Sequence, residues 1–316
     1  MKLDVVTLGE TMVLLVPTSV GPLRYAGQFE KTIGGAESNM AIGLARLGHQ
    51  VGWISRLGND EFGLYVRNFI RGEGVDTSRV IFDDLHPTAV FFKERQLGQE
   101  PRIYYYRKGS AASCMTPEDL DESYITQAQF LYITGITPAL SASCEATVDR
   151  AIELARRNGL TVVFDPNIRL KLWSKEEARR VLIDVASRCD IVMPGFEEGE
   201  ILTGEQTPEK IAACLLANGA RVVVVKLGER GAYFATPEQS EYVEGFPVKQ
   251  IVDPIGAGDA FAAGFLSGLL RGWTYREAVR LGNRTGAYAL TVAGDVEGLP
   301  FWSQIEPQKS GNQVTR

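Results

Sequence analysis

Short apolar runs alternate along most of this chain with longer segments in which apolar residues recur every three or four positions. The short runs are typical of strands buried on both faces, and the longer segments predict amphipathic helices. The predicted strands lie at residues 3–8, 51–55, 130–134, 160–165, 190–193 and 221–226, followed by a hairpin-like pair at 231–235 and 241–246. The clearest predicted helices lie at 61–71, 141–158 and 175–187. This alternation predicts an α/β fold, with a mostly parallel sheet between helical layers.

The alternation breaks at two neighbouring strand-like runs, 89–92 and 102–107, because no helical segment separates them. A further apolar run at 12–16 could join them in a second, smaller sheet. We therefore predict an antiparallel lid beside the main sheet, drawn from about residues 11–33 and 88–108.

The lid is rich in aromatic side chains. Because side chains alternate along a strand, Tyr105 is expected on the face opposite to that of Tyr104 and Tyr106. One face would then pack, and the other would cover a ligand. The exposed aromatic surface, which includes Phe91 and Phe92, could be covered by another subunit, so we expect a homo-oligomer formed through the lid.

Composition narrows the range of functions. The chain has 316 residues, 45% apolar content and a formal net charge of −6, with a pI near 5.2. This acidic balance offers no general attraction to nucleic acid or to an anionic membrane. Four cysteines without a Cys-x-x-Cys pair predict free thiols instead of a zinc site or a disulfide framework. With only two histidines, both in predicted loops, histidine-based acid–base chemistry is not expected.

The ends of the chain carry no sign of a targeting or membrane segment. Residues 1–6 predict a strand without the apolar core of a signal peptide, and no later run is long enough to span a membrane. We expect a cytoplasmic protein with one domain over residues 1–310, followed by a disordered polar tail at 311–316.

A loop of small residues precedes an apolar helical segment at residues 253–261. The first N–H groups of a helix have no internal partner, and Gly256 and Gly258 would let an anion approach the backbone. Asp259 follows, where a carboxylate could meet the reaction partner of that anion. The alternative is a tight turn with an acid that complements the helix dipole. A dinucleotide fingerprint is disfavoured, because it needs a third glycine where Phe261 stands.

A second glycine turn, at residues 33–39, opens another helical segment. The adjacent Gly34 and Gly35 would allow a small polar ligand to contact the backbone. Asn39, one turn later, offers both a donor and an acceptor. A plain helix start with a solvent-facing amide is the alternative.

Polar side chains follow several predicted parallel strands, at the sheet edge where ligands collect. They are Glu10, Asn167 with Arg169, Glu198, and Lys226 with Gly228 and Gly231. Glu10 is a candidate sugar contact, Arg169 could clamp a carboxylate, and Glu198 could organise Mg²⁺ through water. On the lid strand, Arg107 could present a second cation to an acidic substrate. Solvated loop or strand-end side chains and helix-dipole complements are the alternatives.

The two glycine turns, the lid and these strand ends together resemble the ribokinase-like (PfkB-type) family of sugar kinases over roughly residues 3–300. The motifs that carry the resemblance are Gly34-Gly35-Ala36-x-x-Asn39 and Asp253-Pro254-x-Gly256-Ala257-Gly258-Asp259. The resemblance implies a three-layer α/β/α sandwich with a mostly parallel central sheet and a small β-sheet lid.

Within this family, further segments resemble the branch that phosphorylates the sugar acid 2-keto-3-deoxygluconate. They are Gly9-Glu10, Tyr105 to Ala111, 135–140, Asp165-x-Asn167-x-Arg169 and Gly294-Asp295-x-Glu297-Gly298. The resemblance implies ATP-dependent phosphorylation of a primary hydroxyl, giving 2-keto-3-deoxy-6-phosphogluconate. The carboxylate of a keto acid would give the guanidiniums of Arg107 and Arg169 a shared purpose.

The resemblance also implies a role for each matching residue. Asp259 would be the catalytic base, with the N–H groups of Gly256, Ala257 and Gly258 around the transferring phosphoryl group. The sugar site would comprise Glu10, Gly34, Gly35, Asn39, Phe91, Tyr105, Arg107, Arg169 and Asp295, with support of the C-terminal loop as the alternative role of Asp295. The nucleotide site would comprise Asn167, Lys226, Gly228, Gly231, Gly256, Gly258 and Asn283, with Ala287 nearby.

ATP and Mg²⁺ are the implied cofactors. Many relatives carry an Asn-x-x-Glu motif near the metal, but Gly195 occupies the asparagine position here and leaves Glu198 alone. We therefore expect Glu198 to reach Mg²⁺ through water. Loop carbonyls near Asp253 and Ile255 could also hold a monovalent cation such as K⁺, as in several relatives.

Three other functions stay open at this point. A fructokinase or a ribokinase-type kinase would share the fold and differ in the pocket. A non-catalytic sugar-binding regulator would not need the carboxylate of Asp259 beside the loop that contains Gly256 and Gly258. An NAD-dependent oxidoreductase is disfavoured by Phe261 at the third-glycine position and by the lack of a suitable histidine.

Overall fold

The structure is a computed structural model that describes residues 2–94 and 102–306. Its main sheet consists, in sheet order, of β13 (Ser240–Val243), β12 (Ala232–Ala235), β11 (Val222–Lys226), β10 (Ile191–Val192), β9 (Thr161–Asp165), β8 (Phe130–Thr134), β1 (Val5–Leu8), β4 (Val51–Gly58) and β5 (Asp76–Asp83). The strands from β11 to β5 run parallel, and β12 and β13 extend the edge as an antiparallel hairpin. The predicted polar tail at 311–316 lies outside the described residues.

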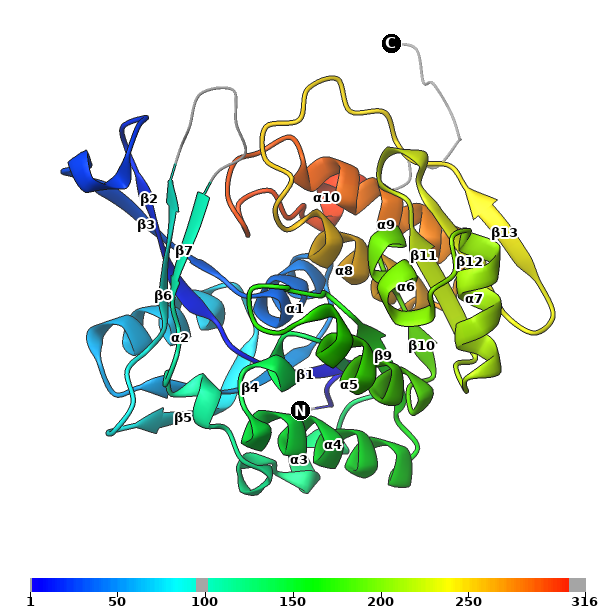
Figure 1. The fold of residues 1–316 in the computed structure, drawn as a ribbon, viewed down its shortest axis with the longest axis horizontal. Coiled ribbons are helices and arrows are strands. Elements are labelled where there is room, and N and C mark those ends of the chain that lie inside the picture. Colours follow the sequence, from blue (N-terminus) through cyan, green and yellow to red (C-terminus); the bar gives the residue numbers. More distant parts are fainter. Residues whose placement is uncertain (1, 95–101, 307–316) are drawn as a thin grey trace, which may run out of the picture.

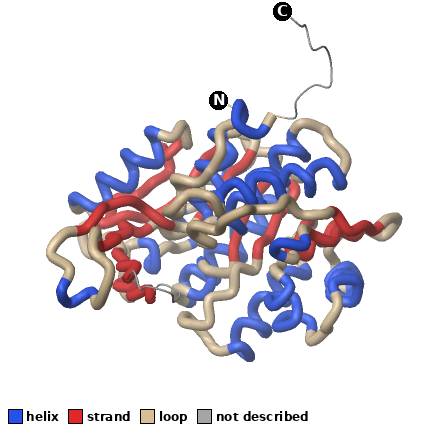
Figure 2. Tube along the Cα trace, turned by 90° about the horizontal axis from the view of Figure 1, so that it is seen from above, coloured by secondary structure: helices blue, strands red, loops and turns tan. Residues whose placement is uncertain are grey.

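Helices cover both faces of this sheet (Figures 1 and 2). One face carries α1 (Ala36–Arg46), α2 (Glu61–Gly72), α8 (Ala257–Leu270) and α9 (Tyr275–Ala289). The other face carries α3 (Glu122–Ile125), α4 (Ala142–Arg157), α5 (Lys175–Ser187), α6 (Phe196–Thr203) and α7 (Pro208–Ala217). The predicted three-layer α/β/α sandwich is therefore confirmed.

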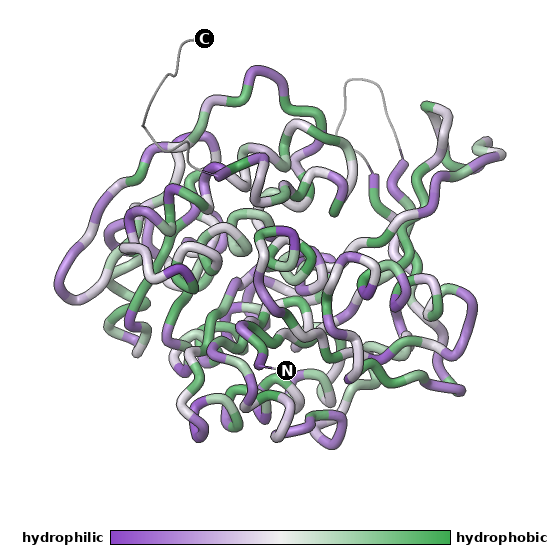
Figure 3. The backbone as a smooth tube through the Cα atoms, turned by 180° about the vertical axis from the view of Figure 1, so that it is seen from behind, coloured by the Kyte–Doolittle hydropathy of each residue, from purple (hydrophilic) through white to green (hydrophobic). Residues whose placement is uncertain are grey.

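Two apolar cores result, one on each side of the sheet. In β1, for example, Val5 packs into the core beneath α1 and α8, whereas Val6 and Leu8 pack into the core beneath α4 and α5. This division follows from the alternation of side chains along a strand. Figure 3 shows many hydrophobic segments in the interior and many hydrophilic ones in the outer loops.

Short helical elements connect or cap these layers. They are the 3₁₀ turns η1 (Leu23–Tyr25), η2 (Ala112–Cys114), η3 (Pro117–Asp119), η4 (Thr137–Ala139) and η5 (Gly228–Arg230), and the C-terminal α10 (Trp302–Ile305). Among the helices of the described residues, none combines the length and apolar character that crossing a bilayer requires.

The lid is a separate sheet whose strand order is β3 (Phe29–Gly34), β2 (Met12–Pro17), β6 (Val90–Glu94) and β7 (Arg102–Tyr106). The prediction of a purely antiparallel lid is wrong, because β2 and β6 run parallel. The connection between these two strands passes through β3, α1, β4, α2 and β5, and it is long enough to bring the chain back in the same direction.

Two strands were not predicted from the pattern of apolar residues, and both lie at a sheet edge. Strand β3 is exposed over its first half and polar there, and β5 is only half-buried along most of its length. Neither shows the continuous apolar run of a central strand, because one side of an edge strand faces solvent.

The two faces of the lid differ as predicted from the alternation of its tyrosines. Tyr105 is half-buried and stacks on Phe91, with ring centroids 5.6 Å apart, while Tyr104 and Tyr106 are exposed. Phe91 in turn packs with Met12 and other apolar side chains of the inner face, so the prediction that it belongs to the exposed aromatic surface is wrong. The inner face therefore has a core of its own, and the outer face presents tyrosines to solvent.

Helices α8 and α9 approach each other so closely that the packing requires glycine. A Cβ added to Gly264 of α8 would lie 2.2 Å from Oγ1 of Thr285 and 2.9 Å from Cα of Gly282, both on α9. Thr285 cannot rotate away from the added Cβ without breaking a hydrogen bond, because its hydroxyl donates to the carbonyl of Ala260 (2.7 Å).

We predict that Gly264→Ala lowers the free energy of unfolding by about 1–3 kcal/mol, because the added methyl group overpacks the α8–α9 contact. Urea denaturation would measure this change. Gly72→Ala is the matched control, since Gly72 also lies in a helix and its Cβ would meet nothing within 4 Å. Equal stability of the two variants would contradict the prediction.

Candidate active site

The carboxyl ends of β8, β9 and β11 open at one edge of the main sheet, where the N-termini of α1 and α8 also meet (Figure 1). Asp259 lies there, in the first turn of α8. Its Oδ2 accepts a hydrogen bond from Nδ2 of Asn39 (2.8 Å), and its Oδ1 accepts a longer one from Nδ2 of Asn167 (3.4 Å). The fold thus brings together the two glycine turns and the loop that follows β9.

The carboxyl group of Asp259 is almost fully buried. Burial raises its pKa to about 7, and the hydrogen bond from Asn39 counteracts this shift. Nearby Asp165 raises the pKa further, whereas the positive charges of Arg169 and Lys226 lower it. A carboxylate with a pKa close to neutrality is suited to accepting a proton near neutral pH.

The loop before Asp259 is built to receive an anion. Gly256, the N-cap of α8, has a φ of 79°, and within the described residues the N–H groups of Gly256, Ala257 and Gly258 have no acceptor. A Cβ on Gly258 would lie 3.8 Å from Nζ of Lys226. Free N–H groups at a helix N-terminus, with an ammonium beside them, form a site for a phosphate group.

Lys226, which was predicted for the nucleotide site, lies beneath this loop, because its Nζ comes within 3.8 Å of a Cβ built on Gly258. At the ends of β11 and β9, its Nζ donates to Oδ2 of Asp165 (2.6 Å). Burial raises the pKa of Asp165, and the charge of Lys226 counteracts that effect. The pair leaves the ammonium close to both Gly258 and Asp259.

Asp295 lies on the other side of the Gly34 turn. A Cβ on Gly34 would lie 2.6 Å from Oδ2 of Asp295 and 2.7 Å from Cζ of Phe91, so only glycine lets these groups meet. Burial raises the pKa of Asp295 to about 7, while the charge of Lys93 counteracts this shift. Oδ1 of Asp295 and Oδ1 of Asn39 are buried without a hydrogen-bond partner in the described residues. Unpartnered buried oxygens of this kind are candidate ligand contacts.

The two predicted arginines differ in their surroundings. Arg107 donates from Nε to Oε2 of the buried Glu10 (2.7 Å), and Ser110 donates to the other carboxylate oxygen. Glu10 therefore orients Arg107, and its predicted contact with sugar stays a prediction. Arg169 is exposed, and its side chain has no hydrogen bond in the described part of the chain. Its charge nevertheless acts on Asp259 and Asp295, which places it beside the site.

A metal would find few free ligands in the protein itself. Oε1 of Glu198 accepts from the backbone N–H of Ile168 (2.9 Å), and Oε2 accepts from that of Gly195 (2.7 Å). Within residues 2–94 and 102–306, no group of three or more acidic, histidine or cysteine side chains could hold a metal ion. The residues fit a Mg²⁺ ion that arrives with the phosphates of a nucleotide better than one bound by a protein cage.

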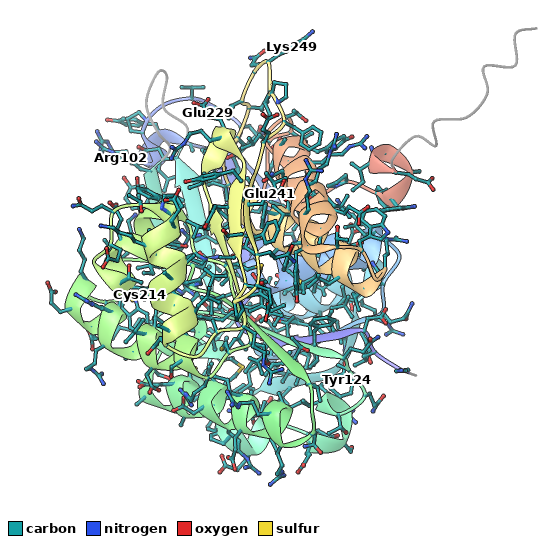
Figure 4. All side chains as sticks on the ribbon, turned by 90° about the vertical axis from the view of Figure 1, so that its right-hand side faces the viewer. Arg102, Tyr124, Cys214, Glu229, Glu241 and Lys249 are labelled. Atoms are coloured by element: carbon teal, nitrogen blue, oxygen red, sulfur yellow. The ribbon has the colours of Figure 1, made fainter. Side chains whose placement is uncertain are left out.

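An open pocket of about 480 Å³ lies next to the anion loop. It is lined by Pro247, Val248, Lys249, Gln250, Val252, Arg284, Ala287, Tyr288 and Thr291. Ala287, an expected neighbour of the nucleotide, is among them. Figure 4 shows Lys249 at the tip of the loop between β13 and α8, pointing away from the body of the protein.

Asn283 and Gly231, both predicted for the nucleotide site, are not among the residues that line this pocket. Nδ2 of Asn283 donates to the carbonyls of Val243 and Glu244 (both 3.0 Å). Gly231 has a φ of 92°, and a Cβ there would lie 2.1 Å from the carbonyl oxygen of Val243. Gly228, also predicted for the nucleotide site, begins the adjoining η5 turn.

Three buried charged side chains near the site had no role predicted from the sequence. Lys93 and Asp253 form an ion pair. Glu37 is fully buried in α1, and its Oε1 accepts from the hydroxyls of Thr134 and Thr137 (both 2.7 Å). Burial raises the pKa of Glu37, and its Oε2 has no partner in the described residues. The sequence carries no clear signal for Glu37, because an acidic residue in the first turn of a helix is commonly a dipole complement.

Comparison with known proteins agrees with this geometry. A family model described as pfkB family carbohydrate kinase matches residues 2–302. The chain is 44% identical over 302 residues to a 2-dehydro-3-deoxygluconokinase of Bacillus subtilis (strain 168), covering 95% of this chain and 93% of the relative.

Solved structures show the same likeness. The PfkB protein from Polaromonas sp. JS666 has a TM-score of 0.89 and 46% identity, covering 96% of this chain and 98% of that one. A fructokinase from Vibrio cholerae O395, with fructose, ADP and calcium ion bound, has a TM-score of 0.84 and 29% identity over 95% and 97% of the two chains. The family match spans both glycine turns, the lid and the buried carboxylate of α8. The chain belongs to the pfkB family of carbohydrate kinases.

Proposed function

We propose that this protein is a cytoplasmic, ATP-dependent kinase that phosphorylates the 6-hydroxyl of 2-keto-3-deoxygluconate, giving 2-keto-3-deoxy-6-phosphogluconate. The observation that carries the proposal is the buried Asp259, with a pKa of about 7, beside the free N–H groups of the α8 N-terminus. The acceptor is supported by the Bacillus subtilis relative, because 2-dehydro-3-deoxygluconate in its name is another name for the same compound.

Asp259 acts in this mechanism as the general base. Its carboxylate accepts the proton of the 6-hydroxyl as that oxygen attacks the γ-phosphorus of ATP, and the bond to the β–γ bridging oxygen breaks to release ADP. The amides of Asn39 and Asn167 hold the carboxylate in place. Oδ1 of Asn39 has no partner in the described residues and is free to accept from a sugar hydroxyl.

The charge of the transferring phosphoryl group is met by the anion loop. The N–H groups of Gly256, Ala257 and Gly258 donate to its oxygens, and the ammonium of Lys226 adds a positive charge. When bound, Mg²⁺ neutralises phosphate charge, and Glu198 is the residue proposed to reach it through water. The adenosine part of the nucleotide occupies the pocket lined by Val252 and Ala287.

The acidic end of the sugar is recognised by Arg169 and Arg107. Arg169 has no side-chain hydrogen bond within the described residues, so its fork of donors is available to a carboxylate. Arg107 is held in position by Glu10. Asp295 accepts from a hydroxyl, and Phe91 with Tyr105 covers the apolar face of the substrate from the lid. A neutral sugar would leave the guanidinium of Arg169 without a carboxylate, whereas Arg107 already has that of Glu10.

We predict that Asp259→Asn lowers kcat by about 10²- to 10⁴-fold, because the amide cannot accept the proton. In the wild type, kcat/KM is expected to rise with pH and to level off above about 7, since the folded-state pKa of Asp259 is raised to about 7 and only its ionised form is active. Steady-state rates between pH 5 and about 9 would check both points. Asp84→Asn, on an exposed loop after the edge strand β5, is the control. Retention of most of the rate by Asp259→Asn would exclude it as the base.

We predict that Arg169→Met raises KM for 2-keto-3-deoxygluconate by about 10- to 100-fold, because a charge-assisted contact to the carboxylate is lost. Turnover of fructose, which has no carboxylate, should hardly change. A rate panel over both sugars would measure this difference, with the surface variant Arg150→Met as control. If the wild type preferred fructose, the protein would be a fructokinase, and sugar binding without any product would indicate a regulator.

We further propose a homodimer formed through the outer face of the lid, where Tyr106 is 69% exposed and where Tyr104 of the same strand and Phe29 of the opposite edge strand β3 are also exposed. Sedimentation equilibrium should give about twice the chain mass of 34.7 kDa. Tyr106→Lys should shift the protein toward monomer, because a lysine interrupts the aromatic surface. Tyr242→Lys, on the exposed edge strand β13, should leave the mass unchanged. A wild-type monomer at all concentrations would refute the dimer.

A further inference from the structure

We propose that Lys93 is a positioning residue for the anion loop, residues 254–258, and that its ammonium takes the place of a monovalent cation beside Asp253. This inference rests on the proposed kinase function, but Lys93 belongs to neither the sugar site nor the nucleotide site described above. It explains why a lysine of the lid is buried next to a loop of the main domain.

The contact joins two distant parts of the chain. Nζ of Lys93, on β6, donates to Oδ2 of Asp253, which is 160 positions away in the sequence and directly precedes the anion loop. The two residues are only 7% and 6% exposed. Lys93 lies two positions after Phe91, so both side chains leave β6 on the inner face of the lid. The ion pair therefore links the inner face of the lid to the loop that binds phosphate.

Asp253 organises two loops at once. Its Oδ1 accepts from the N–H of Ile255, and its Oδ2 accepts from the N–H of Gly294 (both 3.2 Å). These loops also touch directly, because a Cβ on Gly256 would lie 2.7 Å from the carbonyl oxygen of Asp295. A shift of the Asp253 carboxylate would consequently displace both the N–H groups that face the phosphoryl group and the side chain of Asp295.

A buried carboxylate needs a positive partner, because removing its charge from water is costly. Within the described residues, Lys93 is the one side chain that forms an ion pair with Asp253. Loop carbonyls near a carboxylate suit a monovalent cation. Here the carboxylate of Asp253 is already neutralised by the ammonium of Lys93, which is part of the protein chain. A free cation would therefore add little, and turnover should not depend on which monovalent cation the solution contains.

The test compares kinase rates in potassium, sodium and choline chloride at equal ionic strength. For the wild type, we expect rates that agree within about twofold, because less than 0.5 kcal/mol of activation free energy would then depend on the cation. Lys93→Met should lose at least about tenfold in kcat in choline, with a smaller change in KM for the sugar, and should recover activity in K⁺ or methylammonium. Lys93→Arg should retain most of the wild-type rate without added cation.

Lys31→Met is the matched control, since Lys31 is an exposed lysine of the same lid sheet and should behave like the wild type. Strong activation of the wild type by K⁺ would overturn the proposal, whether or not the Lys93 variants fold. Full activity of Lys93→Met in choline would overturn it as well.

A second measurement separates this proposal from the proposed function. Calorimetric titration with ADP and Mg²⁺ reports on the anion loop without any sugar turnover. Absence of sugar phosphorylation by the wild type would refute the kinase function, whereas the effect of K⁺ on ADP binding would still test Lys93. Cation-independent binding to the wild type, together with K⁺-dependent binding to Lys93→Met, is the expected result. Equal cation dependence in both proteins would refute the role of Lys93.

Discussion

Burial of the Asp259 carboxylate is the constraint on which the rest of the site depends. Burial raises its pKa to about 7, so the group keeps a proton affinity that an exposed aspartate would lack. This state is tolerable only because Asn39 and Asn167 donate to both oxygens and because cations lie nearby. Those donors come from separate segments, so the sheet, α1 and α8 must all be in place before the carboxylate is held correctly.

The buried charges around this carboxylate are mostly arranged in pairs. The three pairs closest to the site are Lys226–Asp165, Arg107–Glu10 and Lys93–Asp253. Each pair joins two segments that are far apart in the sequence, so each fixes a loop or strand end while satisfying its own charges. Among the groups near the site that have no partner in the described residues, Oδ1 of Asn39, Oδ1 of Asp295 and the guanidinium of Arg169 are proposed to contact a ligand. The pairs thus hold Arg107 and Lys226 in place for the ligand, and the unpaired groups add further donors and acceptors for recognition.

The two faces of the lid carry different kinds of side chain. Its inner face carries Phe91, Tyr105 and Lys93 toward the site, and its outer face carries the exposed tyrosines. Because successive residues of a strand point to opposite sides, one short strand can serve the pocket and a subunit contact at once. The parallel pairing of β2 with β6 places the strand after the Gly9-Glu10 turn beside the strand that carries Phe91.

The sequence by itself determined the layered fold and the two glycine turns, because both depend on local features. Apolar runs with helices between them require a mostly parallel sheet, and glycines before an apolar helix are readable at one place in the chain. The edge strands β3 and β5 were missed because half-exposed strands carry no clear apolar run. Only the tertiary structure decided which charges meet. Glu10 could not be known to orient Arg107, nor Lys93 to neutralise Asp253, because hydrogen bonds across about a hundred or more positions leave no periodic mark in the sequence.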